Sequence, residues 1–594
     1  MPQLRVALAQ VDTTVGDVAA NAALIRSWTA RAAAQGAHLV AFPEMALTGY
    51  PVEDLTLRAS FVEASREALA RLAKDLEADG YGEVVVVLGY LDRAADQTGS
   101  PIGVPKGRPQ NAAAVVHRGQ VAQKVVKHHL PNYGVFDEYR FFVPGRELSV
   151  VRVHGVDVAL AICEDLWQEG GPVAAARDSD AGLLLVINAS PYERLKDDVR
   201  LELVTRRAAQ ADCPVAFVNL VGGQDDLVFD GDSLVVSTAG EVLARAPQMV
   251  EHLLVTDLEL AAATDGVKAT TTPTAARPQE EPSVPVVRHV VLHDEPVAPY
   301  EARPGEIAPP LDDLAEVYAA ITLALRDYVR KNGFRSVVLG LSGGIDSSLV
   351  AAIAADAIGA ENVYGVSLPS EYSSDHSKSD AADLAHRIGL HLRTIAIAPI
   401  VSAFLGEVAL TGVAEENLQA RVRGMVWMGL ANQEGHLALT AGNKSELATG
   451  YSTIYGDAAG GFGPLKDVPK TLVWALARWR NEEAVRRGET PPIPENAITK
   501  PPSAELRPGQ VDQDSLPEYD LLDALLEAYV EGAQGRSELI AAGFDPAVVD
   551  SVVTLVDRAE WKRRQYPPGP KISPVAFGRD RRLPITSRWR EHEA

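Results

Sequence analysis

Apolar residues in the first 260 or so positions fall into short runs rich in Val, Leu, Ile and Ala, which are typical of buried strands. We expect strands at residues 5–9, 38–42, 83–90, 156–162, 182–188 and 215–220. Leu24, Ile25 and Trp28 have helical spacing, which predicts a helix over residues 20–34. Strands that alternate with helices indicate an α/β domain. Turn signals at Asp230-Gly231 and Ala239-Gly240 predict that later strands pair in antiparallel fashion.

This pattern stops near residue 263. Residues 263–310 are rich in Pro, Thr and Glu and lack apolar periodicity, so we expect an extended linker lying partly on the surface. A chain of 594 residues should also contain more than one core, since single cores stop growing at roughly 250–300 residues. We therefore expect a first domain at residues 1–262 and a second at residues 311–594.

A second α/β pattern follows the expected linker. Strands are predicted at residues 336–341, 362–368, 392–397 and 436–440. Helices are predicted at residues 311–331, 347 onward, 380–388 and 417–432, and more helices after Pro464. This alternation predicts a doubly wound parallel sheet, whose ligands bind at the carboxyl ends of the strands.

The charge balance narrows the possible partners. Lys and Arg number 56 against 80 Asp and Glu, so the net charge is −24, which argues against nucleic-acid binding and against an anionic membrane surface. The chain lacks an apolar run of the roughly 20 residues that a membrane span requires. Two cysteines exclude a disulfide scaffold, and the first residues lack a secretory pattern, so a cytoplasmic location is expected.

Residues 339–348, Leu-Gly-Leu-Ser-Gly-Gly-Ile-Asp-Ser-Ser, form a glycine-bearing loop between a predicted strand and a predicted helix. Backbone N–H groups at such a turn favour an anion. The loop lacks the Gly-Lys-Ser/Thr ending of a Walker loop. Asp346 and two hydroxyls stand in its place, which suits a pyrophosphate linked through a metal ion. The alternative interpretation is a plain strand–helix turn.

The loop resembles the pyrophosphate loop of the N-type ATP pyrophosphatases. Residues 417–423, 442–451, 456–457, 500–506 and 569–572 resemble motifs of the NAD synthetases, so the resemblance covers essentially the whole second half. It implies that ATP is bound by Gly340, Leu341, Ser342, Gly343, Gly344, Ile345, Asp346, Ser347, Ser348, Thr440, Ala441 and either Arg421 or Arg423. It also implies that deamido-NAD+ is bound by Asn417, Glu446 and Lys571, and Mg²⁺ by Asp346 or Glu446. The family has a Thr where this chain has Ala441, and Thr440 lies one position earlier.

A second candidate site involves Cys163, which ends an apolar strand just before a predicted helix. A helix N-terminus or a nearby Lys lowers the pKa of a thiol toward the reactive thiolate. Glu44 and Lys127 also follow apolar strands. A Glu, a Lys and a Cys at neighbouring strand ends can cleave an amide: Glu44 moves the proton, Lys127 stabilises the oxyanion and Cys163 forms a thioester. Cys213 is expected to be an inert core residue.

These elements resemble the nitrilase/amidase superfamily, whose fold is an α-β-β-α sandwich, and residues 1–262 match it throughout. Lys127, rather than the alternative Lys124, has the spacing to Leu-Pro seen in that family. Residues 132–138 and 188–192 resemble the glutaminase domains attached to NAD synthetases. This resemblance implies that Tyr133, Ser190 and Lys196 hold glutamine. Alternatively, Tyr133 is a packed aromatic residue and Lys196 a surface charge.

Together the resemblances imply an enzyme that takes ammonia from L-glutamine and amidates deamido-NAD+ to NAD+ with ATP and Mg²⁺, through an adenylated intermediate. They also imply a protein channel for ammonia and a homo-oligomer. Other amidotransferases share the loop, but the asparagine type needs Cys after the initiator Met, where this chain has Pro2. The GMP type uses a Cys-His-Glu triad on another fold, and a tRNA-modifying enzyme is disfavoured by the net charge of −24. A non-enzymatic protein with decayed sites is disfavoured because Glu44, Lys127, Cys163 and Asp346 are all present.

Overall fold

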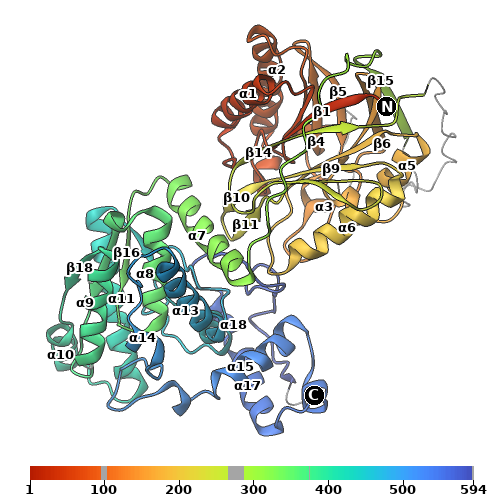
Figure 1. Cartoon of the computed structure of the whole chain (residues 1–594). Coiled ribbons are helices and arrows are strands. Elements are labelled where there is room, and N and C mark those ends of the chain that lie inside the picture. Colours follow the sequence, from red (N-terminus) through yellow and green to blue (C-terminus); the bar gives the residue numbers. More distant parts are fainter. Residues whose placement is uncertain (95–103, 265–285, 374, 592–594) are drawn as a thin grey trace. The chain divides into compact units, whose positions relative to one another are not determined.

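The computed structural model describes residues 1–94, 104–264, 286–373 and 375–591 (Figure 1). The chain divides into two compact units. The first comprises Met1–Gln224 and Phe229–Leu311, and the second comprises Asp225–Val228 and Asp312–Ala594. None of the helices in the described ranges combines the length and the apolar character that crossing a membrane requires.

Two sheets form the centre of the first unit. The six-stranded sheet has the order β14-β1-β2-β3-β4-β5 and contains β1 (Gln3–Gln10), β2 (Leu39–Ala41), β3 (Val85–Arg93), β4 (Pro109–His117), β5 (Gln120–Val126) and β14 (His252–Glu259). The seven-stranded sheet has the order β13-β12-β9-β8-β7-β6-β15 and contains β6 (Glu147–Val153), β7 (Val156–Ile162), β8 (Leu183–Asn188), β9 (Val215–Asn219), β12 (Leu234–Val236), β13 (Val242–Arg245) and β15 (Val286–Val291). A separate hairpin pairs β10 (Val221–Gln224) with β11 (Leu227–Asp230).

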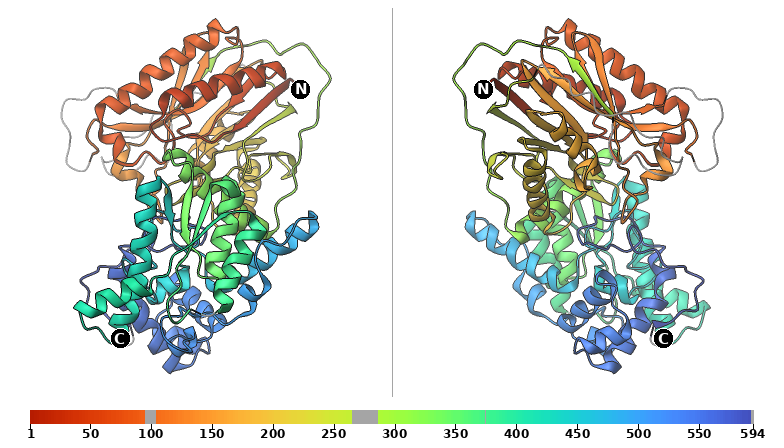
Figure 2. Two further views of the ribbon diagram at one scale, coloured as in Figure 1. Left: turned by 90° about the vertical axis from the view of Figure 1, so that its left-hand side faces the viewer. Right: turned by 90° about the vertical axis from the view of Figure 1, so that its right-hand side faces the viewer.

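Helices cover the outer faces of both sheets (Figures 1 and 2). They are α1 (Val18–Ala34), α2 (Ala59–Ala78), α5 (Gly171–Asp178) and α6 (Lys196–Ala211), with the shorter α3 (Glu138–Phe141), α4 (Glu164–Trp167) and the 3-10 turn η1 (Glu53–Leu57) in the connections. Side chains alternate along the strands: Val6 and Leu8 of β1 join the core between the sheets, whereas Ala7 and Ala9 pack toward α1 and α2. The predicted α-β-β-α sandwich is therefore confirmed.

Each strand expected from residues 1–262 is present, with its ends shifted by a few residues. The antiparallel pairing of later strands is confirmed, because β12 pairs in this way with β9 and β13. Several strands were not expected, among them β5, which lies at a sheet edge and carries Gln120, Gln123 and Lys124. An edge strand tolerates such polar side chains, which hides it from an apolar pattern.

The range that we expected to be a linker, residues 263–310, is described only in part, since residues 265–285 lie outside the described residues. Its described part contains β15, which pairs in parallel with β6 at the edge of the seven-stranded sheet. This segment therefore adds a strand to the first unit.

The second unit is built on a four-stranded parallel sheet with the order β18-β17-β16-β19. Its strands are β16 (Val337–Gly340), β17 (Val363–Ser367), β18 (His391–Thr394) and β19 (Leu437–Leu439). Around and beyond the sheet lie α7 (Asp313–Lys331), α8 (Ile345–Ile358), α9 (Asp375–Ile388), α10 (Ala398–Glu407), α11 (Val413–Glu434), α12 (Lys444–Thr449), α13 (Lys470–Arg486) and α14 (Glu495–Thr499). The helical segment after Pro464 continues with α15 (Tyr519–Leu526), α16 (Arg536–Ala541), α17 (Pro546–Arg558) and α18 (Glu560–Arg563).

Helices pack on both faces of this sheet, as expected for a doubly wound fold (Figure 1). On one face, Val338 and Val366 form a core with Leu418, Val422 and Trp427 of α11. The chain passes from the central strand β16 into the glycine-bearing loop and then α8. The loop thus lies at the carboxyl end of β16, where such sheets bind ligands.

Candidate functional site

Cys163 lies in a strained turn between β7 and α4, and it is buried. Its backbone has φ 47° and ψ −100°, a conformation that a residue with a side chain rarely adopts. The turn is held on both sides, because Cys163 N donates to Ile187 O at 3.0 Å and Leu166 N donates to Cys163 O at 2.9 Å. Strain of this kind costs on the order of 1–3 kcal/mol and concentrates at functional sites. Neither cysteine forms a disulfide, and Cys213 is buried in the core.

A buried lysine lies between two buried carboxylates, Glu44 after β2 and Glu138 at the start of α3. Lys127 follows β5 and Glu44 follows β2, and Lys127 Nζ lies 2.7 Å from Glu44 Oε1. The same Nζ lies 2.9 Å from Oε2 of Glu138. Burial lowers the pKa of Lys127, but the Glu138 and Glu44 charges outweigh it and hold that pKa well above its usual value. Lys127 is therefore a permanent cation.

Glu44 receives hydrogen bonds from three sides. Besides Lys127, Asn111 Nδ2 donates to Glu44 Oε1 at 2.6 Å and Ala189 N donates to Oε2 at 3.1 Å. The Asn111 side chain comes from β4, and Ala189 follows β8 of the other sheet. These donors fix the carboxylate in one orientation.

The charges of Glu44 and Lys127 both act on Cys163. Burial raises the pKa of the Cys163 thiol well above its usual value, and the Glu44 carboxylate raises it further, whereas Lys127 lowers it. The resting thiol is therefore protonated, so attack requires a base. The structure thus brings together the three residues that we predicted to be catalytic, from strands of two different sheets.

Glu138 and Tyr50 belong to this site, and the sequence analysis assigned neither a role. Tyr50 Oη donates to Glu138 Oε1 at 3.0 Å. Burial raises the pKa of Glu138 to about 7, with Lys127 lowering it and Glu44 raising it. Glu138 could have been found from the sequence, because it is the last residue of the motif at residues 132–138, from which we selected only Tyr133.

Tyr133 lies beside the nucleophile turn. Its hydroxyl donates to Oε2 of Glu164, the residue after Cys163, at 2.8 Å. Its side chain is 54% exposed and its ring packs edge-on against Phe136. Tyr133 is thus open to solvent while its hydroxyl is tied to the residue after Cys163.

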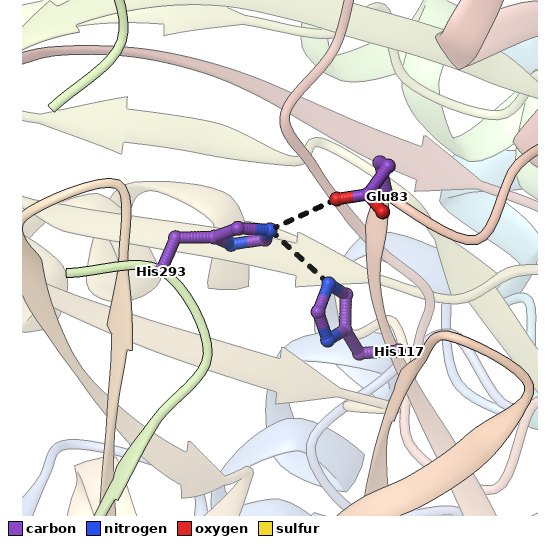
Figure 3. A group of neighbouring side chains, drawn as sticks. All are labelled: Glu83, His117 and His293. Atoms are coloured by element: carbon purple, nitrogen blue, oxygen red, sulfur yellow. Dashed lines mark hydrogen bonds and ion pairs between the residues drawn. The ribbon is translucent and has the colours of Figure 1, made fainter. Parts of the chain in front are cut away.

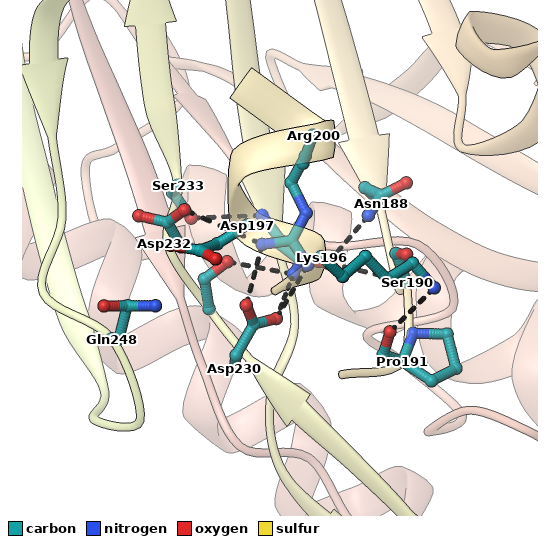
Figure 4. A network of polar contacts seen from close by, with 12 residues as sticks. Asn188, Ser190, Pro191, Lys196, Asp197, Arg200, Asp230, Asp232, Ser233 and Gln248 are labelled. Carbon is teal, nitrogen blue, oxygen red and sulfur yellow. Dashed lines mark hydrogen bonds and ion pairs between the residues drawn. The ribbon is translucent and has the colours of Figure 1, made fainter. Parts of the chain in front are cut away.

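Ser190 and Lys196 follow β8, on the segment that leads into α6 (Figure 4). Ser190 N donates to Asn219 Oδ1 at 3.1 Å, and Asn188 Nδ2 donates to the same oxygen at 2.8 Å. Lys196 Nζ donates to Pro191 O at 3.0 Å. The Lys196 ammonium therefore lies over the segment that carries Ser190, rather than projecting freely into solvent.

A buried ionic network anchors the start of α6 (Figure 4). Arg200 makes two hydrogen bonds with Asp230, of 2.8 and 3.0 Å, and none of these atoms is exposed. Arg245 pairs with Asp232 at 2.6 Å, and Asp232 lies 3.8 Å from Arg200. The network fixes the helix on which Lys196 is the first residue.

In the second unit, the glycine-bearing loop is shaped by contacts that only glycine allows. Gly343 has φ 77°, and a Cβ there would lie 2.3 Å from Ser377 O. Gly344 N donates to Ser342 Oγ at 3.1 Å, and Ser348 Oγ donates to Gly344 O at 2.8 Å. The remaining predicted loop residues are part-buried Gly340, and buried Leu341, Ile345 and Ser347. The loop is thus a closed turn at the start of α8.

Asp346 of this loop is joined to Glu446 through Asn443. Asn443 Nδ2 donates to Asp346 Oδ1 at 2.9 Å, while Glu446 N donates to Asn443 Oδ1 at 3.0 Å. Lys470 at the start of α13 forms an ion pair with Asp346 Oδ2. Burial raises the pKa of Glu446 well above its usual value, and the Asp346 charge raises it further. Lys470 and Asn443 were not predicted as site residues, although Asn443 lies in the run 442–451.

Two neighbouring carboxylates of this kind suit Mg²⁺, which is bound by one or two carboxylates together with substrate phosphates. The repulsion between Asp346 and Glu446, visible in the raised pKa of Glu446, would be relieved by a divalent cation. The residues present therefore fit the ion.

Arg421 and Arg423 both lie on α11, but their side chains have different surroundings. Arg421 is exposed, and its Nε donates to Ile454 O at 3.3 Å. Arg423 is part-buried, its Nε donates to Leu368 O at 3.1 Å, and burial lowers its pKa. Arg421 is therefore the more accessible of the two for a ligand phosphate.

Thr440 is buried at the end of β19. Its hydroxyl accepts a hydrogen bond from Gly442 N at 3.3 Å, and its own N–H donates to Phe462 O at 3.0 Å. Ala441 supplies no hydroxyl. The Thr440 hydroxyl therefore shapes the loop ahead of α12.

Asn417 and Lys571 are also held by neighbouring residues of this unit. Asn417 Oδ1 accepts from Thr453 Oγ1 at 2.7 Å. Lys571 is buried, donates to Pro574 O at 3.0 Å and pairs with Asp580 at 3.3 Å. Both polar groups are thus oriented by the protein.

Comparisons with known proteins agree with both halves of the chain. The family model described as carbon-nitrogen hydrolase matches residues 5–266, and the model described as NAD synthase matches residues 317–566. The chain is 42% identical to a glutamine-dependent NAD(+) synthetase from Acinetobacter baylyi, over 99% of both chains. It is also 42% identical to one from Aquifex aeolicus, over 99% of this chain and 100% of the other.

A solved structure of a glutamine-dependent NAD+ synthetase from Acinetobacter baumannii superposes with a TM-score of 0.71, at 38% identity and over 99% of both chains. A second, from Cytophaga hutchinsonii, has a TM-score of 0.77 at 21% identity, covers 99% of this chain and 98% of the other, and shows the fold alone. The family is established by relatives above 40% identity that cover nearly the whole chain. The chain belongs to the glutamine-dependent NAD(+) synthetase family.

Proposed function

We propose that the first unit releases ammonia from L-glutamine at Cys163 and that the second unit uses it to amidate deamido-NAD+ activated by ATP. Glutamine-dependent formation of NAD+ is the activity of the family, and the protein is a ligase that forms a carbon–nitrogen bond. The main support for placing ammonia release in the first unit is the buried Lys127–Glu44 pair, whose charges act on the Cys163 thiol.

In the first unit, Glu44 takes the thiol proton as Cys163 Sγ attacks the amide carbon of glutamine. Lys127 and the backbone N–H of Glu164 stabilise the oxyanion. Glu44 returns the proton to the departing ammonia, which leaves a thioester on Cys163, and water then releases glutamate. The substrate is held by three residues around the nucleophile: Tyr133, Ser190 and Lys196.

In the second unit, residues 340–348 bind the phosphates of ATP together with Arg421, Thr440 and Ala441. The nicotinate carboxylate of deamido-NAD+ attacks the α-phosphate, so pyrophosphate leaves and an adenylate forms. Ammonia then attacks the activated carbonyl carbon, and AMP leaves as the amide is completed. Asn417, Glu446 and Lys571 hold deamido-NAD+.

Asp346 and Glu446 would hold Mg²⁺, which neutralises phosphate charge when bound. Lys470 balances the Asp346 carboxylate, and Asn443 donates to both carboxylates, from Nδ2 to Asp346 and from its backbone N–H to Glu446. These contacts would keep the two acidic side chains in place before ATP arrives.

Product analysis tests the proposal as a whole. The protein is mixed with deamido-NAD+, ATP, Mg²⁺ and glutamine, and we expect NAD+, AMP, pyrophosphate and glutamate. ADP and phosphate in place of AMP and pyrophosphate would contradict the adenylated intermediate.

We also infer a homo-oligomer in the cytoplasm; light scattering that gives the mass of one chain would contradict the assembly.

A further inference from the structure

Three side chains of the first unit converge outside the glutaminase residues (Figure 3). His117 Nε2 lies 3.1 Å from His293 Nε2, and His293 Nε2 lies 3.5 Å from Glu83 Oε2. One ligand atom from each residue lies within 4.8 Å of the other two. The cluster has no place in the amidation chemistry proposed above.

The three residues come from both sheets. Glu83 precedes β3, and His117 is the last residue of the neighbouring β4, both in the six-stranded sheet. His293 follows β15, the edge strand of the seven-stranded sheet. Anything that bound all three side chains would cross-link the two layers of the sandwich.

His293 is held in position by its surroundings. Its backbone N–H donates to Arg152 O at 3.2 Å, and its ring stacks on His154 at 4.1 Å with an interplanar angle of 9°. In the described part of the chain, the buried Nδ1 of His293 has no hydrogen-bond partner. When the ring proton is on Nδ1, the lone pair on Nε2 is directed at the cluster.

His117 is also suited to act as a ligand. Its ring is buried and lies edge-on to the His293 ring, with 4.6 Å between the ring centroids. A neutral imidazole is the form that binds metal ions.

We propose that His117 Nε2, His293 Nε2 and Glu83 Oε2 bind one divalent transition-metal ion of the Zn²⁺ type, with water in a fourth position. Zn²⁺ binds imidazole nitrogen at about 2.0–2.1 Å in tetrahedral geometry, which places its ligand atoms about 3.3 Å apart. Two of the three separations, 3.1 and 3.5 Å, lie on either side of that value, and the third, between His117 and Glu83, is within 4.8 Å. Two imidazoles and a carboxylate favour such an ion over Mg²⁺, which prefers oxygen ligands alone.

Arg118 competes for the carboxylate but does not block it. Its Nε and Nη2 each donate to one Glu83 oxygen at 2.9 Å, and the Glu83 side chain is 71% exposed. Exposed ion pairs contribute little, and each carboxylate oxygen keeps a second lone pair for the metal. The bound ion would fasten the edge strand β15 to the six-stranded sheet and so stabilise the sandwich.

The test uses the full chain after removal of metals with EDTA. Zn²⁺ binding is counted by calorimetry, and Co²⁺ is bound in its place to report ligand type by absorption. The variants His117→Asn, His293→Asn and Glu83→Gln each remove one ligand, and Glu83→Gln alters a side chain that is 71% exposed. His252→Asn is the matched control, because His252 also pairs with a glutamate, Glu306 at 3.1 Å, and is not a member of the cluster.

We expect one Zn²⁺ per wild-type chain at this site, with a rise in Tm on binding. Each of the three variants should bind this ion at least about tenfold more weakly and lose the rise in Tm, whereas His252→Asn should behave as wild type. Equal binding by all variants would overturn the proposal, as would no binding by the wild type. A thiolate-to-cobalt absorption band would also overturn it, since it would place the ion on a cysteine.

Discussion

The ammonium of Lys127 lies 2.7 Å from Oε1 of Glu44, and neither side chain is exposed. Two opposite charges removed from water in this way depend on each other, because either one alone would be a buried, uncompensated charge. The pair therefore links the stability of the first unit to its proposed chemistry. Substitutions that remove one charge of this pair should therefore affect both stability and activity, whereas substitutions that leave both charges in place can change activity alone.

Glu44→Gln keeps the shape of the side chain but removes the base. We expect glutamine-dependent NAD+ formation to fall by about 10²–10⁴-fold, since this is the usual contribution of a positioned base. Formation from added ammonium salts should persist, because the second unit is unchanged. Equal loss with both nitrogen sources would argue that Glu44 only supports the fold.

Lys127→Met should abolish glutaminase activity and also destabilise the first unit. Loss of one partner of a buried pair costs about 3–5 kcal/mol, and here two carboxylates are left behind. Lys124→Met is the control, since Lys124 is a part-exposed residue that pairs with Asp92 at 2.7 Å. Denaturant unfolding and glutamine hydrolysis are measured for both variants, and only Lys127→Met should lose stability and activity. Full activity of Lys127→Met would reject the proposed oxyanion role.

Cys163→Ala should lower glutamine-dependent synthesis by at least about a thousandfold, because it removes the nucleophile. Synthesis from ammonium salts should be retained. Cys213→Ala serves as the comparison, because Cys213 is the other buried cysteine and lies in the core next to α6. Mass spectrometry of the protein with glutamine should detect the thioester only where Cys163 is intact.

Glu138→Gln should change how stability depends on pH. The pKa of Glu138 is raised from 4.5 to about 7, chiefly by burial, so between these values the folded protein holds a proton that the unfolded chain has released. The free energy of unfolding of the wild type therefore falls as pH rises through this window. Glutamine does not titrate, so the Glu138→Gln variant should not show this fall in stability. Between about pH 5 and about pH 8, the melting temperature of the wild type should fall relative to that of the variant as pH rises. Parallel curves of melting temperature against pH for the two proteins would contradict the raised pKa.

Asp346→Asn should abolish synthesis with either glutamine or ammonium, by at least about a hundredfold, because a charged ligand beside the phosphates is lost. Glutamine hydrolysis by the first unit should continue. Asp356→Asn is a matched control on the same helix, since Asp356 pairs with Arg480 at 2.7 Å. Normal turnover by Asp346→Asn would rule out the metal role.

Local patterns were enough to locate both candidate sites. The run 156–162 is a strand that ends at Cys163, and the loop 339–348 joins β16 to α8. Apolar runs, glycines and helical spacing are properties of neighbouring residues, so they can be read directly from the chain. The same holds for the fold class of each half, which follows from the alternation of strands and helices.

The partners of these residues could not be found in this way. Glu138, the first residue of α3, shares the Lys127 ammonium with Glu44, which follows β2. Lys470 meets Asp346 across 124 residues of sequence. Such contacts arise only when strands pair and helices pack, since neither residue type nor spacing marks them.

The sequence by itself therefore determined which segments form strands, helices and turns, because these depend on local periodicity and backbone preference. Its motifs also marked Cys163 as a candidate nucleophile and residues 339–348 as a candidate anion-binding loop. The tertiary structure alone decided which side chains meet: Lys127 with Glu138, Asp346 with Lys470, and His117 with His293. Those pairings follow from strand order and the stacking of two sheets in the first unit, and from the packing of α8 with α13 in the second. Burial then sets their electrostatics, since a charge removed from water must find its partner within the fold.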